Sequence, residues 1–231
     1  MNELERVEAQ ALRDAVALGG GRAETAGGAM CLSHPAPLHE LNRAIPVGAH
    51  VDAAAILDWY GGRPHDVCVP PGYLGLDESL RALGYEPAQA WTKFRRGDDP
   101  ARPAPTAFRV EETLDAAVFA VAAAQPEELV AFVGAPGWAC FVAWDDDEPA
   151  GCGALYADGE VAWLGVGATR PEYRGRGAQS ALLAARIEAG RAVGVRRFSC
   201  ETGEEGGPSY RNLLRAGFHE AYVRPNWRSA A

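Results

Sequence analysis

The chain has 231 residues, of which 48% are hydrophobic and 23% are charged, and its formal net charge at pH 7 is −9. This composition is typical of a globular protein with one large or two small domains. The acidic balance argues against nucleic acid as a partner, and no stretch approaches the roughly 18 apolar residues of a membrane span. The first residues, MNELERVEAQALRDAV, lack the apolar core of a signal peptide. We therefore expect a cytoplasmic protein that binds neither nucleic acid nor membrane.

The N-terminal part of the chain predicts a mixture of helices and strands. Helices are expected where apolar residues recur every three or four positions and a glycine follows. Strands are expected where short apolar runs lie between turn residues. The predicted helices are 5–20, 52–62 and 76–84, and the predicted strands are 27–34, 66–72 and 85–96.

A linker is predicted near the middle of the chain. The segment RRGDDPARPAPT, residues 95–106, has three prolines, clustered charges and no large apolar side chain. This composition is typical of a connection between two folded parts. We place the boundary at 95–105, between an N-terminal half, 1–94, and a C-terminal half, 106–231.

The C-terminal half predicts a strand, two helical pieces, three strands, and then helix, strand, helix and strand. The two helical pieces are separated near Pro126. The three strands are joined by the short turns DDDEP and DGE, as in an antiparallel meander. The predicted strands are 108–112, 138–145, 149–158, 160–169, 196–202 and 218–227, and the helical segments are 114–134, 177–194 and 209–217.

The cysteines and histidines predict no disulfide framework and no metal site. The five cysteines are odd in number and never form a C-x-x-C pair. We expect each to be a small buried hydrophobic residue with a reduced thiol. The five histidines show no metal-ligand spacing, so no metal is expected. The cysteines are Cys31, Cys68, Cys140, Cys152 and Cys200.

The two halves share a weak sequence similarity at their ends. SLRALGYEPAQAWTKFRR, residues 79–96, and NLLRAGFHEAYVRPNW, residues 212–227, both combine a short helix, a glycine, an aromatic residue and an alternating strand. This similarity predicts that the halves are distant structural repeats. Chance is the alternative, because that connection is common.

The stretch YRGRGAQS, residues 173–180, lies between a predicted strand and a predicted helix. The first N–H groups of a helix lack partners inside the helix and carry partial positive charge. Gly175 and Gly177 let the main chain approach a ligand closely, and Arg174 and Arg176 add positive charge. We therefore predict a phosphate or pyrophosphate site; a glycine-rich turn with solvated arginines is the alternative. The sequence matches neither a Walker loop nor a dinucleotide fingerprint.

RGRGAQ resembles the pyrophosphate loop of the Gcn5-related N-acetyltransferase (GNAT) family, whose pattern is [QR]-x-x-G-x-[GA]. Arg174 takes its first position and Gly177 its fourth, whereas Gln179 stands where the family usually has glycine or alanine. WLGVGAT before the loop, and NLLRAGF followed by HEAYVRPNW after it, also match the family's order of elements. The resemblance covers 106–231.

The resemblance implies the GNAT fold, an α/β (α+β) fold with a mixed, mostly antiparallel central sheet flanked by helices. The N-terminal half, 1–94, would be a second, degenerate GNAT-like half without the glycine-rich loop. The implied activity is direct transfer of an acetyl group from acetyl-CoA to a primary amine of a small molecule, by a monomer or a homodimer. Two alternatives stay open: a non-catalytic acyl-CoA-binding or sensing module, and a nucleotide-phosphate binder on another α/β fold.

The resemblance also implies which residues hold the cofactor. The pyrophosphate would be bound by N–H groups from Arg176 to Gln179, with the side chains of Arg174 and Arg176 nearby and a hydroxyl from Ser180 at the helix start. A main-chain N–H from Gly167 to Thr169 would polarise the thioester carbonyl. The candidate cofactor-binding residues are Gly167, Ala168, Thr169, Arg174, Gly175, Arg176, Gly177, Ala178, Gln179, Ser180 and Asn212.

Glycines inside the preceding strand are a separate signal. Gly165 and Gly167 are unfavourable in a strand interior, so they predict a bulge or a close approach by a ligand. A helix packed tightly against these small residues is the alternative. Trp163, two positions before Gly165, is a candidate for lining the acceptor pocket, with core packing as its alternative.

The candidate catalytic residues are Glu201, Glu160 and Tyr210. Either glutamate could accept the amine proton, directly or through water; a solvated turn residue is the alternative for Glu160. The family's usual acid is a tyrosine at the position that Leu213 occupies here, so that acid is missing. Tyr210, three residues earlier on nearly the same helical face, is a candidate substitute, and packing is its alternative.

Overall fold

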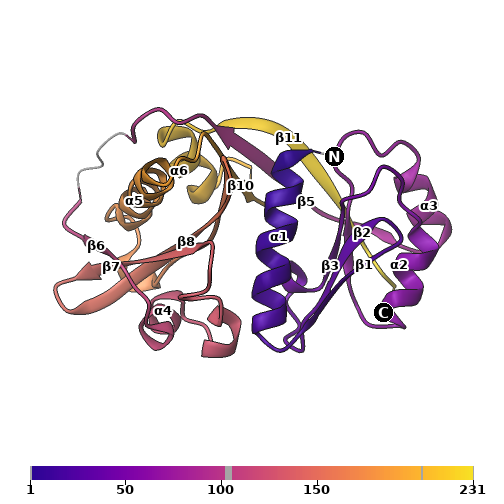
Figure 1. Cartoon of the computed structure of the whole chain (residues 1–231), viewed down its shortest axis with the longest axis horizontal. Coiled ribbons are helices and arrows are strands. Elements are labelled where there is room, and N and C mark those ends of the chain that lie inside the picture. Colours follow the sequence, from indigo (N-terminus) through magenta and orange to yellow (C-terminus); the bar gives the residue numbers. More distant parts are fainter. Residues whose placement is uncertain (1, 102–105, 204, 231) are drawn as a thin grey trace. The chain divides into compact units, whose positions relative to one another are not determined.

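The computed structural model describes residues 2–101, 106–203 and 205–230. Contacts divide the chain into two units, which are described separately: unit 1 is Met1–Lys93 with Ala221–Ala231, and unit 2 is Phe94–Glu220 (Figure 1). The change of unit at Lys93 precedes the predicted boundary at 95–105, of which 102–105 lie outside the described residues. The assignment of the C-terminal segment to unit 1 has no counterpart in the sequence pattern.

Unit 1 contains every element predicted for the N-terminal half, two more strands and a short 3₁₀ helix, His39–Leu41. Strands β1 and β3 were missed because RAETA has no large apolar residue and RAIP is short, charged and ends in proline. The elements are α1 (Glu3–Leu18), β1 (Arg22–Ala26), β2 (Ala29–Ser33), β3 (Arg43–Pro46), α2 (Ala53–Tyr60), β4 (Asp66–Cys68), α3 (Leu76–Ala82) and β5 (Glu86–Arg96), which ends in unit 2.

The sheet of unit 1 combines antiparallel and parallel pairs. Strands β1, β2 and β3 pair antiparallel in sequence, β4 lies parallel to β3, and β11 (His219–Arg228) pairs antiparallel with β4. One core of this unit contains Ile56 of α2, Leu80 of α3 and Trp227 of β11. The last strand of the chain therefore completes the sheet of the N-terminal unit.

A cluster of buried charges lies in unit 1. The carboxylate of Glu8 on α1 contacts Arg43, Lys93 and Arg224, and Glu5 also contacts Arg224. The side chains of Glu8, Lys93 and Arg224 are fully buried, with 0% exposure. Buried charges of this kind are tolerated only when they are paired. The cluster joins the first helix to strands β3, β5 and β11.

Unit 2 and the last strand, β11, together confirm the element order predicted for the C-terminal half. The break near Pro126 is present, because α4 stops before it and a short 3₁₀ helix, Glu127–Val130, follows. The elements are β6 (Arg109–Glu112), α4 (Ala116–Ala123), β7 (Trp138–Asp145), β8 (Glu148–Asp158), β9 (Val161–Thr169), a 3₁₀ helix (Pro171–Tyr173), α5 (Ala178–Ala192), β10 (Arg197–Thr202) and α6 (Pro208–Arg215).

The sheet of unit 2 is the predicted mixed sheet. Strands β6 to β9 form an antiparallel meander, and β10 lies parallel to β9. Helix α5 covers one face through Leu182, Leu183 and Ile187 (Figure 1). Side chains alternate across a strand, so Leu164 points to α5 and Trp163 to the opposite face, where it meets Trp138.

The two units repeat one order of elements. The stretches from α1 to β5 and from α4 to β11 each run as a helix, three antiparallel strands, a helix, a strand parallel to the third strand, a short helix and a final strand, although most of the second final strand, β11, lies in unit 1. This is the predicted internal repeat, at the level of the fold. All five cysteines are free and buried, as predicted. Among the described helices, none is both long and apolar enough to cross a membrane.

Candidate functional site

Strands β9 and β10 separate part of the way along their length. Their parallel pairing covers Arg197↔Val161, Phe198↔Ala162 and Ser199↔Trp163, and it ends there although β9 continues to Thr169. Beyond Trp163, one edge of β9 therefore has no paired strand within the described residues. Main-chain groups along such an edge can bind an extended ligand as a strand would bind it.

The other edge of β9 is interrupted by a bulge, as its glycines predicted. The pairing with β8 passes from Ala154↔Gly165 to Cys152↔Ala168, so Val166 and Gly167 have no partner in register. Val166 has a φ of 50°, in the left-handed region that a β-branched residue rarely adopts. Such a conformation costs on the order of 1–3 kcal/mol and persists only where neighbouring groups hold it.

Two polar side chains of α5 reach this bulge from the face of the sheet that α5 covers. Gln179 donates from Nε2 to the carbonyl oxygen of Ala168 at 2.6 Å and to Oγ1 of Thr169 at 3.1 Å. Arg186, two turns further along α5, donates to the carbonyl oxygen of Gly165 at 3.2 Å. The side chain of Gln179 therefore holds the end of β9. Its main-chain N–H, in the first turn of the helix, is the group of this residue that faces the preceding loop.

The predicted phosphate loop has the geometry that its glycines indicated. Gly175 and Gly177 have φ angles of 76° and 93°, which favour glycine, and Gly177 is the residue from which α5 starts. No side chain in the described part of the chain caps this helix, and its first internal bond is from the N–H of Ala181 to the carbonyl oxygen of Gly177. The N–H groups from Gly175 to Ser180 have no acceptor among the described residues.

The corresponding helix of unit 1 has a closed N-terminus. The carboxylate of Asp52 accepts hydrogen bonds from the N–H groups of Ala54 and Ala55, at the start of α2, at 3.0 and 3.2 Å. A fixed negative charge at this position repels a second anion. This difference between α2 and α5 explains physically why only unit 2 has a candidate anion site in the repeated position.

The arginines of the loop are already engaged. Arg176 makes a bidentate bond to Asp145, at 2.7 and 2.8 Å, and its guanidinium lies 4.9 Å from the ring centre of Phe108. Arg174 donates from Nε to the carbonyl oxygen of Thr169 at 3.1 Å. Both side chains are near the loop, as predicted, but Arg176 would have to share its charge between Asp145 and a phosphate.

Glu201 lies at the open end of the paired strands. It is two positions beyond Ser199, the last paired residue of β10, and it shares by alternation the sheet face of Trp163. It is partly exposed. The structure therefore brings Glu201 beside the free edge of β9.

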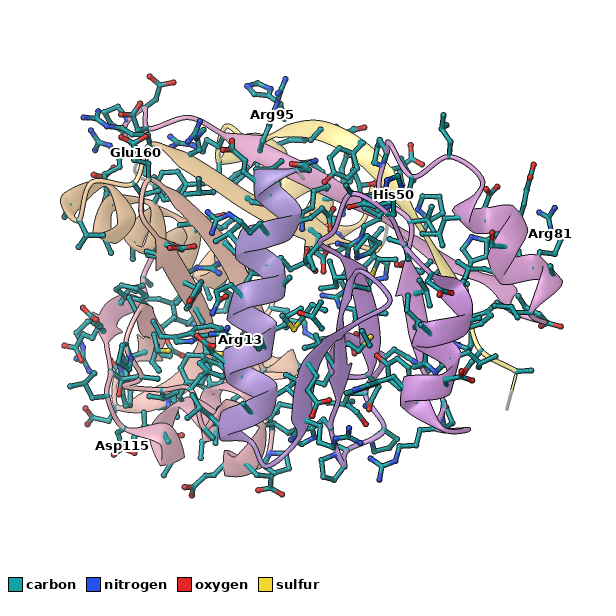
Figure 2. All side chains as sticks on the ribbon, turned by 45° about the vertical axis from the view of Figure 1, so that its right-hand side comes forward. Arg13, His50, Arg81, Arg95, Asp115 and Glu160 are labelled. Carbon is teal, nitrogen blue, oxygen red and sulfur yellow. The ribbon has the colours of Figure 1, made fainter. Side chains whose placement is uncertain are left out.

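Glu160 lies at the opposite end of β9. It precedes Val161, where pairing begins, and its side chain is 69% exposed and 3.9 Å from Arg197. Figure 2 shows Glu160 at the outer edge of unit 2. At ~3.3 Å per residue, Gly165 is roughly 16 Å further along the strand. The structure does not bring Glu160 to the bulge, so the geometry favours Glu201.

The remaining predicted residues lie on α5 and α6. Ser180 is in the first turn of α5, behind the loop. On α6, Asn212 accepts a hydrogen bond from Arg215 at 2.6 Å. The Tyr210 hydroxyl donates to Glu220, and its ring packs edge-on against Phe94 at 5.2 Å between ring centres. The tyrosine is thus hydrogen-bonded and packed; its role as acid stays a prediction.

Burial shifts the ionisation of groups behind the bulge. It lowers the pKa of Arg186 to about 10, and it raises the pKa of Cys140 and Cys152 to about 12. At pH 7 the guanidinium is therefore charged and the thiols are neutral. Among the described residues, no group of three or more His, Cys, Asp or Glu side chains is placed to hold a metal ion.

Two residues of this site were not singled out in the sequence. Arg186 lies within the predicted helix 177–194, and Val166 lies within the predicted strand 160–169. A signal was available for the arginine, because a charged residue between Leu183 and Ile187 interrupts an otherwise apolar face. No sequence signal marks the φ of Val166, since valine ordinarily avoids that region.

A family comparison identifies the class of protein to which this fold and this loop belong. The model of the GNAT acetyltransferase family matches residues 89–218, more than half of the chain. The chain therefore belongs to the GNAT family, as predicted. Acetyl transfer from acetyl-CoA is general for this family. No curated relative matches the chain.

Solved structures agree with the tandem architecture. A GCN5-related N-acetyltransferase from Kribbella flavida is 18% identical, with a TM-score of 0.72 over 100% of this chain and 97% of that one. A tandem GNAT protein from the clavulanic acid biosynthesis pathway is 17% identical, with a TM-score of 0.63 over 90% and 78%. A putative GNAT acetyltransferase from Novosphingobium aromaticivorans is 13% identical, with a TM-score of 0.60 over 90% and 91%. These similarities confirm the fold.

Proposed function

We propose that this protein is an acetyl-CoA-dependent N-acetyltransferase whose acceptor is the primary amine of a small molecule. The observation that carries the proposal is the open strand edge beyond Trp163, which is followed, after a short 3₁₀ helix, by the uncapped helix start at Gly177. The strand edge would bind the pantetheine amides, and the N–H groups of the loop would bind the pyrophosphate. The donor would therefore lie along β9, with its thioester near the bulge.

The transfer itself needs one base and one polarised carbonyl. The neutral amine nitrogen attacks the thioester carbon, a C–N bond forms, and negative charge moves to the carbonyl oxygen, where a main-chain N–H of β9 stabilises it. The C–S bond then breaks and its electron pair leaves on the CoA sulfur. The amine proton passes to Glu201, directly or through water, and the thiolate takes a proton from solvent.

A binding measurement tests the donor site. Titration calorimetry of the full chain should detect acetyl-CoA and CoA, with no comparable signal from ATP or NAD. Gly177→Ala forces a side chain into the left-handed region at the loop and should weaken CoA binding by about 10-fold. Gly194→Ala is the matched control, because Gly194 has a φ of 90° just beyond the other end of α5, in open space. Equal effects of the two variants on CoA affinity would contradict the assignment of the loop.

An activity measurement separates the enzyme from a non-catalytic module. Acetyl-CoA is incubated with a broad panel of small primary amines, and CoA thiol release is followed. Amine-dependent thiol release supports the proposed function. Tight CoA binding without release by any amine would favour a sensing module, for which the absence of the family's tyrosine, at Leu213, is the specific indication.

A further inference from the structure

Arg186 is a charged residue buried in the interior of unit 2. It is 3% exposed and lies on the face of α5 that also carries Leu182, Leu183 and Ile187. Its guanidinium is hydrogen-bonded to three main-chain carbonyl oxygens: those of Leu182 at 3.1 Å, Gly165 at 3.2 Å and Ala154 at 3.3 Å. Among the described residues it forms no salt bridge with a carboxylate. An apolar side chain would suit the core better, so the charge needs another explanation.

The sheet leaves space for this guanidinium. A Cβ atom on Gly153 would lie 2.6 Å from Cζ of Arg186, so no other residue fits at 153 while Arg186 stays in place. Gly153 of β8 also has no paired residue on β9, because it lies opposite the bulge. A Cβ on Gly167 would lie 3.9 Å from Nη2. The arginine therefore reaches the bulge through a position without a side chain.

Arg186 determines which way one peptide group points. The carbonyl of Gly165 and the N–H of Val166 belong to one planar trans peptide, so they point in opposite directions. Because the carbonyl faces Arg186, the N–H of Val166 points away from the guanidinium. Val166, which carries this N–H, has a φ of 50°, a value that a valine does not adopt by local preference. The charged hydrogen bond supplies the interaction that holds it.

We propose that Arg186 is a positioning residue for acyl transfer, which holds the Gly165–Val166 peptide so that the N–H of Val166 donates to the thioester carbonyl oxygen. The inference rests on the proposed function and moves the carbonyl donor from Gly167–Thr169, predicted from the sequence, to Val166. A charged donor on one end of a peptide polarises its N–H end. The arginine thus strengthens the donor as negative charge develops on the substrate oxygen, without touching the substrate.

Carbon-13 NMR of bound acetyl-CoA tests the proposal without an acceptor amine. The carbonyl resonance of acetyl-CoA labelled at the carbonyl should move downfield on binding to the wild type, because a hydrogen bond polarises the carbonyl. Arg186→Met, which fills the core with an apolar chain, should abolish that shift. Arg191→Met is the control on the same helix, where the side chain is 31% exposed and contacts Asp98 and Glu188; it should keep the shift.

Measurements of CoA affinity and of kcat distinguish a positioning role of Arg186 from a purely structural one. Arg186→Met should bind CoA, which has no acyl carbonyl, within about threefold of the wild type, while kcat with a working amine falls by up to about 100-fold. Arg186→Lys, which keeps the charge but not the planar fork, should recover part of kcat. Equal loss of CoA affinity and kcat in both variants would assign Arg186 a structural role only and overturn the proposal.

A ligand-free structure gives an independent test. In crystals of Arg186→Met, Val166 should leave the left-handed region and the Gly165–Val166 peptide should rotate. An unchanged φ at Val166 would overturn the proposal even if the wild type is an active enzyme. A wild type that fails to bind acetyl-CoA would instead overturn the proposed function and this inference with it, so the two failures are distinguishable.

Discussion

The buried charge cluster of unit 1 makes a strong prediction about stability. Glu8→Gln removes a carboxylate that contacts Lys93, lies 2.5 Å from Arg43 and lies 2.9 Å from Arg224, all in the interior. Removing one partner of a buried ionic group costs about 3–5 kcal/mol, because the cations stay buried without it. At about 2–4 °C per kcal/mol for a chain of this size, the melting temperature should fall by roughly 10 °C.

The pH dependence of this effect follows from the pKa of Glu8. Burial alone would raise that pKa, but Arg224, Lys93 and Arg43 lower it by more, so the folded value is well below the ordinary one. The unfolded chain has the ordinary value of about 4.3. The stabilisation by Glu8 is therefore complete above that pH and is lost as the pH falls through the folded pKa. Glu8→Gln should differ most from the wild type at pH 6–7, and the difference should shrink below about pH 4.

Calorimetric unfolding of both proteins between pH 3 and 7 measures this difference. Asp14→Asn is the control on the same helix, because Asp14 is partly exposed and its partners among the described residues are its near neighbours Gln10 and Arg13; its effect should stay below about 1 kcal/mol. Adding Lys93→Met to Glu8→Gln should recover stability, since it removes one of the buried cations. If Glu8→Gln destabilises no more than Asp14→Asn at pH 7, the reasoning about the cluster is wrong.

Three further predictions concern the candidate site. Asp145→Asn frees Arg176 for a phosphate, so calorimetry should find CoA binding about two- to fivefold tighter and more salt-dependent; unchanged affinity would show that Arg176 does not face the phosphates. Glu201→Gln should lower kcat at least about 10-fold without changing CoA affinity, whereas Glu160→Gln should change neither quantity. A larger loss of kcat in Glu160→Gln than in Glu201→Gln would assign the role of base to Glu160. Gly165→Ala places a Cβ 1.9 Å from an indole carbon of the buried Trp163 side chain. Thermal denaturation should therefore show a melting temperature lower by several degrees; an unchanged melting temperature would refute this packing.

The functional loop could be predicted from the sequence because its information is local. Glycines at 175 and 177, placed between a strand and a helix, specify left-handed backbone and an uncapped helix start wherever the rest of the chain folds. The element order of unit 2 follows in the same way from periodicity and turn residues. Strands β1 and β3 of unit 1 escaped prediction because their sequences carry few apolar residues, and their pairing with β2 supplies the missing stability.

The chain's residues by themselves determine its helices, most of its strands, its family and the position of its phosphate loop, because each depends on neighbours a few positions apart. Only the tertiary structure decides that Glu160 lies far from the bulge while Glu201 lies beside the open edge of β9. It alone shows that Arg186 meets Gly165 and that Glu8 meets Lys93 and Arg224. These contacts join residues distant in sequence, and the free energy of a charge depends on what the fold places around it.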